Sequence, residues 1–249
     1  KKDFEWIRKN NRGAEVWDES ENWGQLAVQG PKASELVSRI FGKEIVEILP
    51  FHFSLFHYRN SPIYLARTGY TGEDGFEIFV GVEEVGPLWD ELLEKGKDLK
   101  VSPIGLGARD TLRTEMKFPL YGHEIDDSTN PYSAGLGWVV KPDKKEFIGR
   151  QKILEVKEAG LTHKLVGIKM RDRGIARQGY GLFSFDNKEI GKVTSGTVSP
   201  NLGENIGIAY LLIPYSSPGT EIMVEIRGKR LRAVVEKTPF VTPGSGGHS

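Results

Sequence analysis

The sequence of 249 residues contains no cysteine, and its 34 lysines and arginines balance its 34 aspartates and glutamates. The absence of cysteine excludes disulfides, thiolate metal sites and cysteine nucleophiles. A formal net charge of zero provides no positive field for nucleic acid or for an anionic membrane surface. No apolar run approaches the roughly 20 residues of a membrane span, and no signal peptide is visible. We therefore expect a soluble protein of the cytoplasm, with no nucleic-acid or membrane partner.

Several signatures of catalysis and metal binding are also missing. The sequence has no Walker loop, no nucleophile elbow and no dinucleotide fingerprint. Its five histidines are not spaced like metal ligands, since His52 and His57 are five residues apart in a predicted strand and the others are isolated. The expected metal content is therefore none.

The two ends of the sequence differ from the rest. The chain begins at Lys1 without a methionine and enters a helical pattern at once, over residues 4–7. We therefore expect the amino end to be truncated. Residues 244–249 (GSGGHS) have the composition of a linker or tag remnant and are left out of the fold prediction.

Hydrophobic periodicity predicts an α+β fold in two parts. In the first part, helices are predicted at 33–41, 82–97, 107–117 and 147–159, and strands at 52–56, 63–66 and 76–80. The helix at 82–97 carries its predicted buried stripe on Val85, Leu88, Trp89, Leu92 and Leu93.

After Gly160 the pattern changes to short alternating strands, at 164–170, 181–185, 188–193, 206–212, 221–226 and 230–235. This spacing favours a small antiparallel barrel or jelly roll. The predicted boundary lies at 149–161, which gives domains at 1–150 and 161–242.

Acidic, cationic and aromatic side chains concentrate between residues 67 and 138, separated by glycines at spacings too irregular for one helix face. This pattern indicates one site assembled from several loops, with a flat, amide-bearing heterocycle as ligand. Glu77 lies inside a predicted strand, where a carboxylate either faces water or meets a partner. Its two oxygens can accept parallel N–H bonds from an amino-pyrimidine edge. The commoner explanation of residues 70–75 is an ordinary turn, because glycine and aspartate dominate turns.

Arg109 lies in the first turn of a predicted helix, with Arg113 one turn further on the same face. Its planar guanidinium suits an anionic or carbonyl group. The plainer alternative is a local surface pair of Asp110 with Arg113, worth under about 1 kcal/mol. Leu112 and Met116 are expected to face the core.

Two aromatic residues follow this helix, Tyr121 in a Leu-Tyr-Gly motif and Trp138 after a glycine. Core packing is the commoner role of such residues. The alternative is that either ring forms a wall on which a ligand ring stacks.

Together and in this order, these motifs resemble the aminomethyltransferase family, the T-proteins of the glycine cleavage system. The segments that carry the resemblance are 29–33, 67–77, 105–113, 120–122, 130–138, 147–150, 191–196 and 199–200. It extends from Lys1 to about Thr242.

The resemblance implies a folate-binding fold of antiparallel sheets with flanking helices, ferredoxin-like, followed by a C-terminal β-barrel or jelly-roll domain. It also implies that about the first third of the family's chain is absent, so that residues 1–150 form only part of the folate-binding domain. The family's catalytic aspartate would lie upstream of Lys1. The catalytic residue is therefore unknown in this chain, since Asp18, Asp74 and Asp110 lie in other motifs.

The function implied is that of an enzyme which takes the aminomethyl group from the lipoyl arm of a partner H-protein. Its carbon passes to tetrahydrofolate, the co-substrate, and ammonia is released. By resemblance, Glu77 would bind the pterin edge and Arg109 the folate or the transferred group, with Tyr70, Tyr121 and Trp138 as pocket walls. The location would be the cytoplasm, or the mitochondrial matrix for a eukaryotic parent. We expect the chain alone to be inactive or severely impaired.

Three alternatives remain open. A folate-dependent demethylating dehydrogenase or oxidase carries a related module at its carboxyl end, fused to a flavin domain. A non-catalytic folate-binding protein of iron–sulfur assembly has a motif of the KGCY type, whereas residues 117–122 here contain no cysteine. The third alternative is a designed or excised folding fragment without activity.

Overall fold

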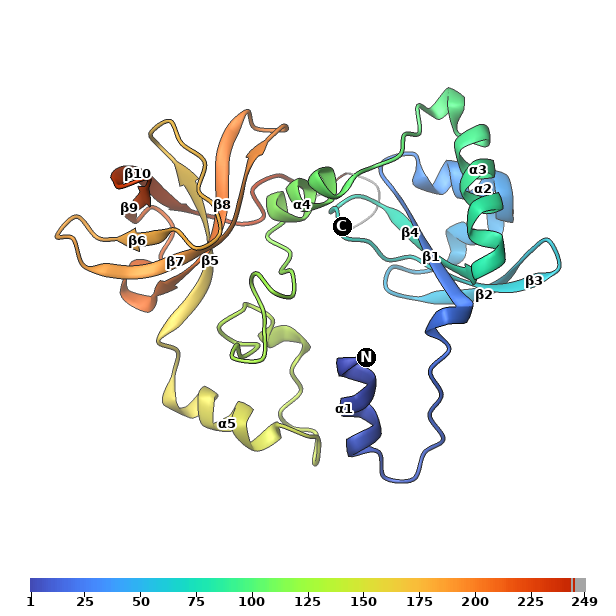
Figure 1. Ribbon diagram of the computed structural model, residues 1–249, viewed down its shortest axis with the longest axis horizontal. Coiled ribbons are helices and arrows are strands. Elements are labelled where there is room, and N and C mark those ends of the chain that lie inside the picture. Colours follow the sequence, from blue (N-terminus) through green and yellow to red (C-terminus); the bar gives the residue numbers. More distant parts are fainter. Residues whose placement is uncertain (243, 245–249) are drawn as a thin grey trace. The chain divides into compact units, whose positions relative to one another are not determined.

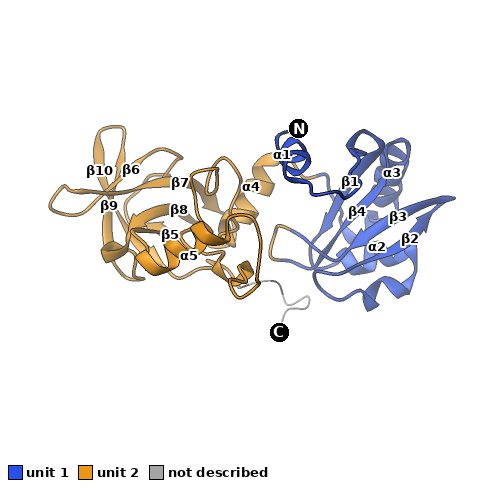
Figure 2. Ribbon diagram, turned by 90° about the horizontal axis from the view of Figure 1, so that it is seen from below, with its two compact units in different colours: residues 1–69, 73–103, 244–249 blue, residues 70–72, 104–243 orange. Residues whose placement is uncertain are grey.

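The computed structural model describes residues 1–242 and Gly244. The described residues form two compact units (Figure 2), unit 1 with residues 1–69 and 73–103, and unit 2 with residues 70–72 and 104–242. Apart from Gly244, the predicted linker or tag remnant at 244–249 lies outside the described residues. Within the described part of the chain, every helix falls short of the length and apolar character that a transmembrane span requires.

Unit 1 is built around an antiparallel sheet of four strands in the order β1-β4-β3-β2. Its strands are β1 (Trp23–Gln29), β2 (Phe53–Tyr58), β3 (Ser61–Ala66) and β4 (Gly75–Gly81), and its helices are α1 (Lys2–Asn10), α2 (Ala33–Phe41) and α3 (Val85–Lys95). Short 3-10 helices lie at Ser20–Asn22, Lys43–Glu47, Val82–Glu84 and Lys97–Leu99. Strands β2 and β3 form a hairpin, which turns at Arg59 and Asn60.

Helices α2 and α3 pack on one face of this sheet (Figure 1). Val37 of α2 and Leu88 of α3 belong to the same buried core as Ile78 of β4. Because successive strand residues point to opposite faces, the positions between these buried ones point away from the helices. That open face carries large apolar side chains that stay exposed, among them Phe53 and Leu55.

Unit 2 contains a closed barrel of six antiparallel strands in the order β10-β5-β8-β7-β6-β9 (Figure 1). The strands are β5 (His163–Met170), β6 (Gly181–Phe183), β7 (Glu189–Ser199), β8 (Glu204–Leu212), β9 (Glu221–Ile226) and β10 (Lys229–Glu236). Helices α4 (Leu106–Glu115) and α5 (Arg150–Ala159) precede the barrel, and 3-10 helices lie at Gly137–Val139 and Ile213–Tyr215. The barrel and the mixed α+β class confirm the predicted fold.

Most predicted elements agree with the observed ones within a few residues, and α2 agrees at both ends. Strand β7 continues six residues beyond its predicted end at 193. This helix stops before Gly42, whose φ of 93° is a conformation that favours glycine. Strand β1 was not among the predicted elements. Two predicted buried faces are wrong in part. Trp89 of α3 is exposed, and α4 leaves Leu112 and Met116 only half-buried while it fully buries Arg113, Thr114 and Glu115.

Candidate functional site

Glu77 lies in the middle of β4, between two residues, Phe76 and Ile78, that are buried against the helices. Strand alternation therefore directs its carboxylate to the open face of the sheet. The Nε2 of Gln25 donates a hydrogen bond of 2.7 Å to Glu77 Oε1, and the Thr68 hydroxyl donates to Oε2. Each carboxylate oxygen thus has one donor and keeps further acceptor capacity.

The loop before β4 is closed by Asp74, which ties it to α2. Arg67 donates to both carboxylate oxygens of Asp74, at 2.9 and 3.0 Å, and the Ser34 hydroxyl donates at 2.6 Å. Burial alone raises the pKa of Asp74, but the hydrogen bonds from Arg67 and Ser34 outweigh burial and lower it below its ordinary value. Asp74 therefore has a structural role, in agreement with the plainer explanation of residues 70–75 as a turn.

Arg109 and Tyr70 are brought together in unit 2. The Arg109 guanidinium lies over the Tyr70 ring, 4.8 Å from its centroid, in a cation–π contact. The other contacts of Tyr70 are a stacked arrangement with Phe118, with 5.8 Å between ring centroids, and a hydrogen bond of 2.6 Å to the Pro119 carbonyl. Burial is the main cause that raises the pKa of Tyr70. The ring is thus a fixed, neutral platform for an exposed guanidinium.

Tyr121 and Trp138 lie at the surface of unit 2, and core packing, the commoner alternative, is wrong for both. Tyr121 is 57% exposed and Trp138 is 70% exposed. The Tyr121 hydroxyl donates to Asp127 at 3.1 Å. Both residues therefore present aromatic surface to solvent.

Arg113 does pair with Asp110, at 2.5 Å, but the expectation of a surface contact is wrong. Its side chain is only 1% exposed and also forms an ion pair of 2.7 Å with buried Glu124. Arg113 donates to the Ser195 hydroxyl at 2.7 Å, and Ser195 in turn donates to Glu124 at 2.6 Å. Sequence reasoning missed Glu124 and Ser195, because no local spacing relates them to the helix.

Further polar contacts, from Glu115 and Thr111, fix α4 to the barrel. Glu115, at the end of the helix, accepts hydrogen bonds from the Ser199 hydroxyl and, at 2.7 Å, from Asn201. Thr111 and Thr197 contact each other through their hydroxyls at 2.9 Å. These buried polar contacts explain why α4 does not turn an apolar stripe to the core.

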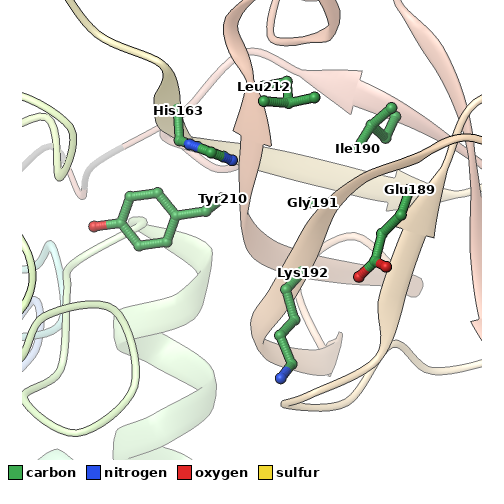
Figure 3. A pocket seen from close by; sticks show the side chains of 7 residues that line it. All are labelled: His163, Glu189, Ile190, Gly191, Lys192, Tyr210 and Leu212. Atoms are coloured by element: carbon green, nitrogen blue, oxygen red, sulfur yellow. The ribbon is translucent and has the colours of Figure 1, made fainter.

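The barrel carries a separate cavity of about 420 Å³ (Figure 3). Its lining residues come from β5, β7 and β8 and are His163, Glu189, Ile190, Gly191, Lys192, Tyr210 and Leu212. The Tyr210 ring is held by a hydrogen bond of 2.8 Å from its hydroxyl to the Glu124 carbonyl. None of the five predicted site residues lines this cavity.

Two family models match the chain. One, described as the GCVT N-terminal domain, covers residues 1–144, and the other, described as the glycine cleavage T-protein C-terminal barrel domain, covers residues 163–242. A protein named aminomethyltransferase from Bdellovibrio bacteriovorus is 59% identical over 241 residues, which are 97% of this chain and 67% of that protein. One of the same name from Leptospira biflexa is 45% identical over 226 residues, 91% of this chain and 61% of that protein.

A solved structure also has the same fold. The crystal structure of glycine cleavage system aminomethyltransferase T from Bartonella henselae superposes with a TM-score of 0.87 at 33% sequence identity. The match covers 97% of this chain and 66% of that one. The chain thus spans about two thirds of the length of the relatives that it matches.

Proposed function

Because the chain belongs to the aminomethyltransferase family, the T-proteins of the glycine cleavage system, we propose that it functions in aminomethyl transfer to tetrahydrofolate. In this reaction the folate nitrogen attacks the methylene carbon of an aminomethyl group on the lipoyl arm of an H-protein. The carbon–nitrogen bond to the amino group breaks, and ammonia leaves with one of the two N–H protons of the folate. A second folate nitrogen displaces the lipoyl sulfur from the same carbon, so the carbon–sulfur bond breaks and the sulfur takes the other proton. Methylenetetrahydrofolate and dihydrolipoyl H-protein remain. The partners proposed are thus folate and lipoylated H-protein, and the location is the cytoplasm.

The observation that carries this proposal is the carboxylate of Glu77 on the open face of unit 1. It is held from two sides, by Gln25 and Thr68, and each of its oxygens can accept one more hydrogen bond. The amino-pyrimidine edge of a pterin offers two parallel N–H donors to such a carboxylate. Glu77 is accordingly proposed to bind the pterin.

Arg109 is proposed to bind an anionic or carbonyl group of the folate or of the transferred group. Its support is an exposed guanidinium placed on the fixed ring of Tyr70. Tyr121 and Trp138 are proposed as stacking walls, because both leave aromatic surface free of the core. Catalysis would consist mostly of holding the folate nitrogen against the methylene carbon, with acid–base assistance as ammonia departs.

The other readings of the sequence are not favoured. The similar curated proteins are named aminomethyltransferases, and the two family models account for residues 1–144 and 163–242. These two ranges also support the proposed domains, 1–150 for folate binding and 161–242 for the barrel.

Calorimetric titration with 5-formyltetrahydrofolate, a stable reduced folate, tests the proposal. We expect Glu77→Gln to weaken binding by about 10-fold or more, because a carboxylate that receives two N–H bonds is replaced by an amide that can match only one of them. Arg109→Ala should also weaken it. Glu83→Gln, an exposed glutamate of unit 1, is the matched control and should leave the affinity unchanged. Equal affinities for Glu77→Gln and the unaltered chain would refute the folate site.

A further inference from the structure

We infer that the planar ring of the ligand lies over Ala66, on one particular side of Glu77, and that the size of residue 66 decides whether the ring fits. This inference rests on the proposed function. It adds the position of the ring on the sheet and identifies a residue that determines specificity without offering a hydrogen bond.

The register of the sheet places four side chains in one row on the open face. Ala27 of β1 pairs with Glu77, Glu77 pairs with Ala66 of β3, and Ala66 pairs with Phe53 of β2. Neighbouring strands lie about 4.8 Å apart, so the Glu77 and Phe53 backbones are roughly 10 Å apart across Ala66. The side chain that stands between them in the row is a single methyl group. The open face thus has a low floor at Ala66, with a carboxylate at one end and an aromatic ring at the other.

Two aromatic rings border this floor. Phe53 and Tyr64 meet edge to face, with 6.0 Å between ring centroids, although Phe53 remains 63% exposed and Tyr64 40% exposed. Such exposed aromatic surface next to a carboxylate suits a flat heterocycle that is polar at its edge and apolar on its faces.

The opposite side of Glu77, towards β1, offers a planar ligand fewer contacts. There Gln25 of β1 already reaches across to the carboxylate with a hydrogen bond of 2.7 Å. Strand β1 is also an edge of the sheet, so among the residues that the structure describes no strand lies beyond Ala27 to supply a wall. Thr68 lies on the β3 side, two residues after Ala66, and donates to the second carboxylate oxygen. Each side thus supplies one donor, and only the β3 side continues to a further strand, where Phe53 is exposed. The quadrant left for a ligand is the one over Ala66.

A pair of matched variants, Ala66→Leu and Ala27→Leu, tests the inference by calorimetry with 5-formyltetrahydrofolate. Both add the same side chain beside Glu77, on opposite sides and on the open face. Ala66→Leu should weaken binding at least about 10-fold, because extra methylenes in the space of a rigid ring cost affinity. Ala27→Leu should stay within about 2-fold, as a surface substitution outside the ligand. Equal losses, or a larger loss for Ala27→Leu, would overturn the inference.

The same titrations separate this inference from the proposed function. If Glu77→Gln leaves the affinity unchanged, or the unaltered chain does not bind, the folate site itself is refuted, and the inference with it. If Glu77→Gln weakens binding and Ala66→Leu does not, only the inference is refuted. Labelled alanine methyl groups give a second readout in the unaltered chain, independent of the folding of the variants. On adding the folate, the Ala66 methyl resonance should move upfield through the ring current, and that of Ala27 should not. The reverse pattern would place the ring on the β1 side.

Discussion

At the scale of single residues, Arg113 connects three segments of unit 2 that are far apart in the chain. Its guanidinium contacts Asp110 on its own helix, Glu124 in the following loop and Ser195 in the barrel. Arg113 and Glu124 are both fully buried, so each charge depends on the other for the solvation that it has lost. The same loop carries Tyr121, and the same helix carries Arg109, so the buried pair also holds two of the proposed ligand contacts in place.

Arg113→Met should lower the free energy of unfolding of unit 2 by about 3–5 kcal/mol, because it leaves the Glu124 carboxylate buried without its partner. Urea denaturation followed by circular dichroism measures this change. The control is Arg232→Met in the same unit. Arg232 forms an ion pair of 2.9 Å with Asp172, but its side chain is 60% exposed, so its loss should cost under about 1 kcal/mol. Similar losses in the two variants would contradict a special role of the buried pair.

The sequence predicted one contact of this arginine and missed the others, for a physical reason. Asp110 lies one helical turn before Arg113, and side chains at that spacing are neighbours in any helix. Glu124 and Ser195 are brought to Arg113 by the path of the loop and by docking of α4 on β7, neither of which leaves a local pattern. The position of Glu77 on the open face, by contrast, follows from strand alternation, so the sequence indicated a carboxylate that faces water or meets a partner, but it did not identify the partner Gln25.

At the scale of elements, the segment between β3 and β4 is held against the start of α2. The Gly30 backbone N–H donates to the Asp74 carbonyl at 2.9 Å, and Ser34 of α2 donates to its carboxylate. Arg67 completes the contact and also donates to the Ile48 carbonyl at 3.1 Å. The segment so fixed contains Thr68, which holds Glu77. Asp74 therefore helps to position Glu77 without contacting it, because it fixes the segment that carries Thr68.

This contact should be visible in the pH dependence of stability. The pKa of Asp74 is lower in the folded chain than the value of about 3.9 of an unfolded aspartate, so the unfolded state binds the proton more readily. The stabilisation is therefore present above about pH 4 and is lost as the pH falls through the lower folded pKa. Asp74→Asn should lose less stability over this acid range than the unaltered chain in urea denaturation. Asp90→Asn, an exposed aspartate of α3, controls for the loss of one carboxylate. Parallel curves for Asp74→Asn and the unaltered chain would contradict the coupling.

The elements that sequence periodicity predicted well are those with a plain division between apolar and polar faces. Helix α2 buries Ala33, Leu36 and Val37 on one stripe, and its ends were predicted to the residue. Strand β1 was missed because Gly24 and the glutamines Gln25 and Gln29 weaken its alternation. The face of α4 was misjudged because its burial depends on polar contacts with the barrel, which periodicity in apolar residues cannot reveal.

At the scale of the whole molecule, the extent of the match to its relatives decides which parts of the proposed reaction can be tested on this chain. It matches its relatives at 59% and 45% identity, but it spans only 67% and 61% of their lengths. Glu77 and the floor at Ala66 lie within unit 1, whereas Arg109, Tyr121 and Trp138 belong to unit 2, so all the proposed ligand contacts lie within this chain. We propose that the acid–base group that helps ammonia to depart is supplied, in a whole relative, by the part of its sequence that this chain does not match. We therefore expect folate binding to be retained in this chain while the rate of aminomethyl transfer falls.

We expect the chain to bind 5-formyltetrahydrofolate and yet to form methylenetetrahydrofolate far more slowly than a whole relative. A general acid or base contributes about 100- to 10,000-fold to a rate, so its absence should lower turnover by at least about 100-fold. The measurement is the formation of methylenetetrahydrofolate from aminomethyl-lipoyl H-protein, with the Bdellovibrio aminomethyltransferase assayed in parallel as the control. The decisive comparison is of turnover at saturating folate, because weak binding would raise the folate concentration required without lowering the limiting rate. Equal limiting rates would show that residues within this chain supply the acid–base chemistry, and the search for that group would then return to unit 1 and unit 2 themselves.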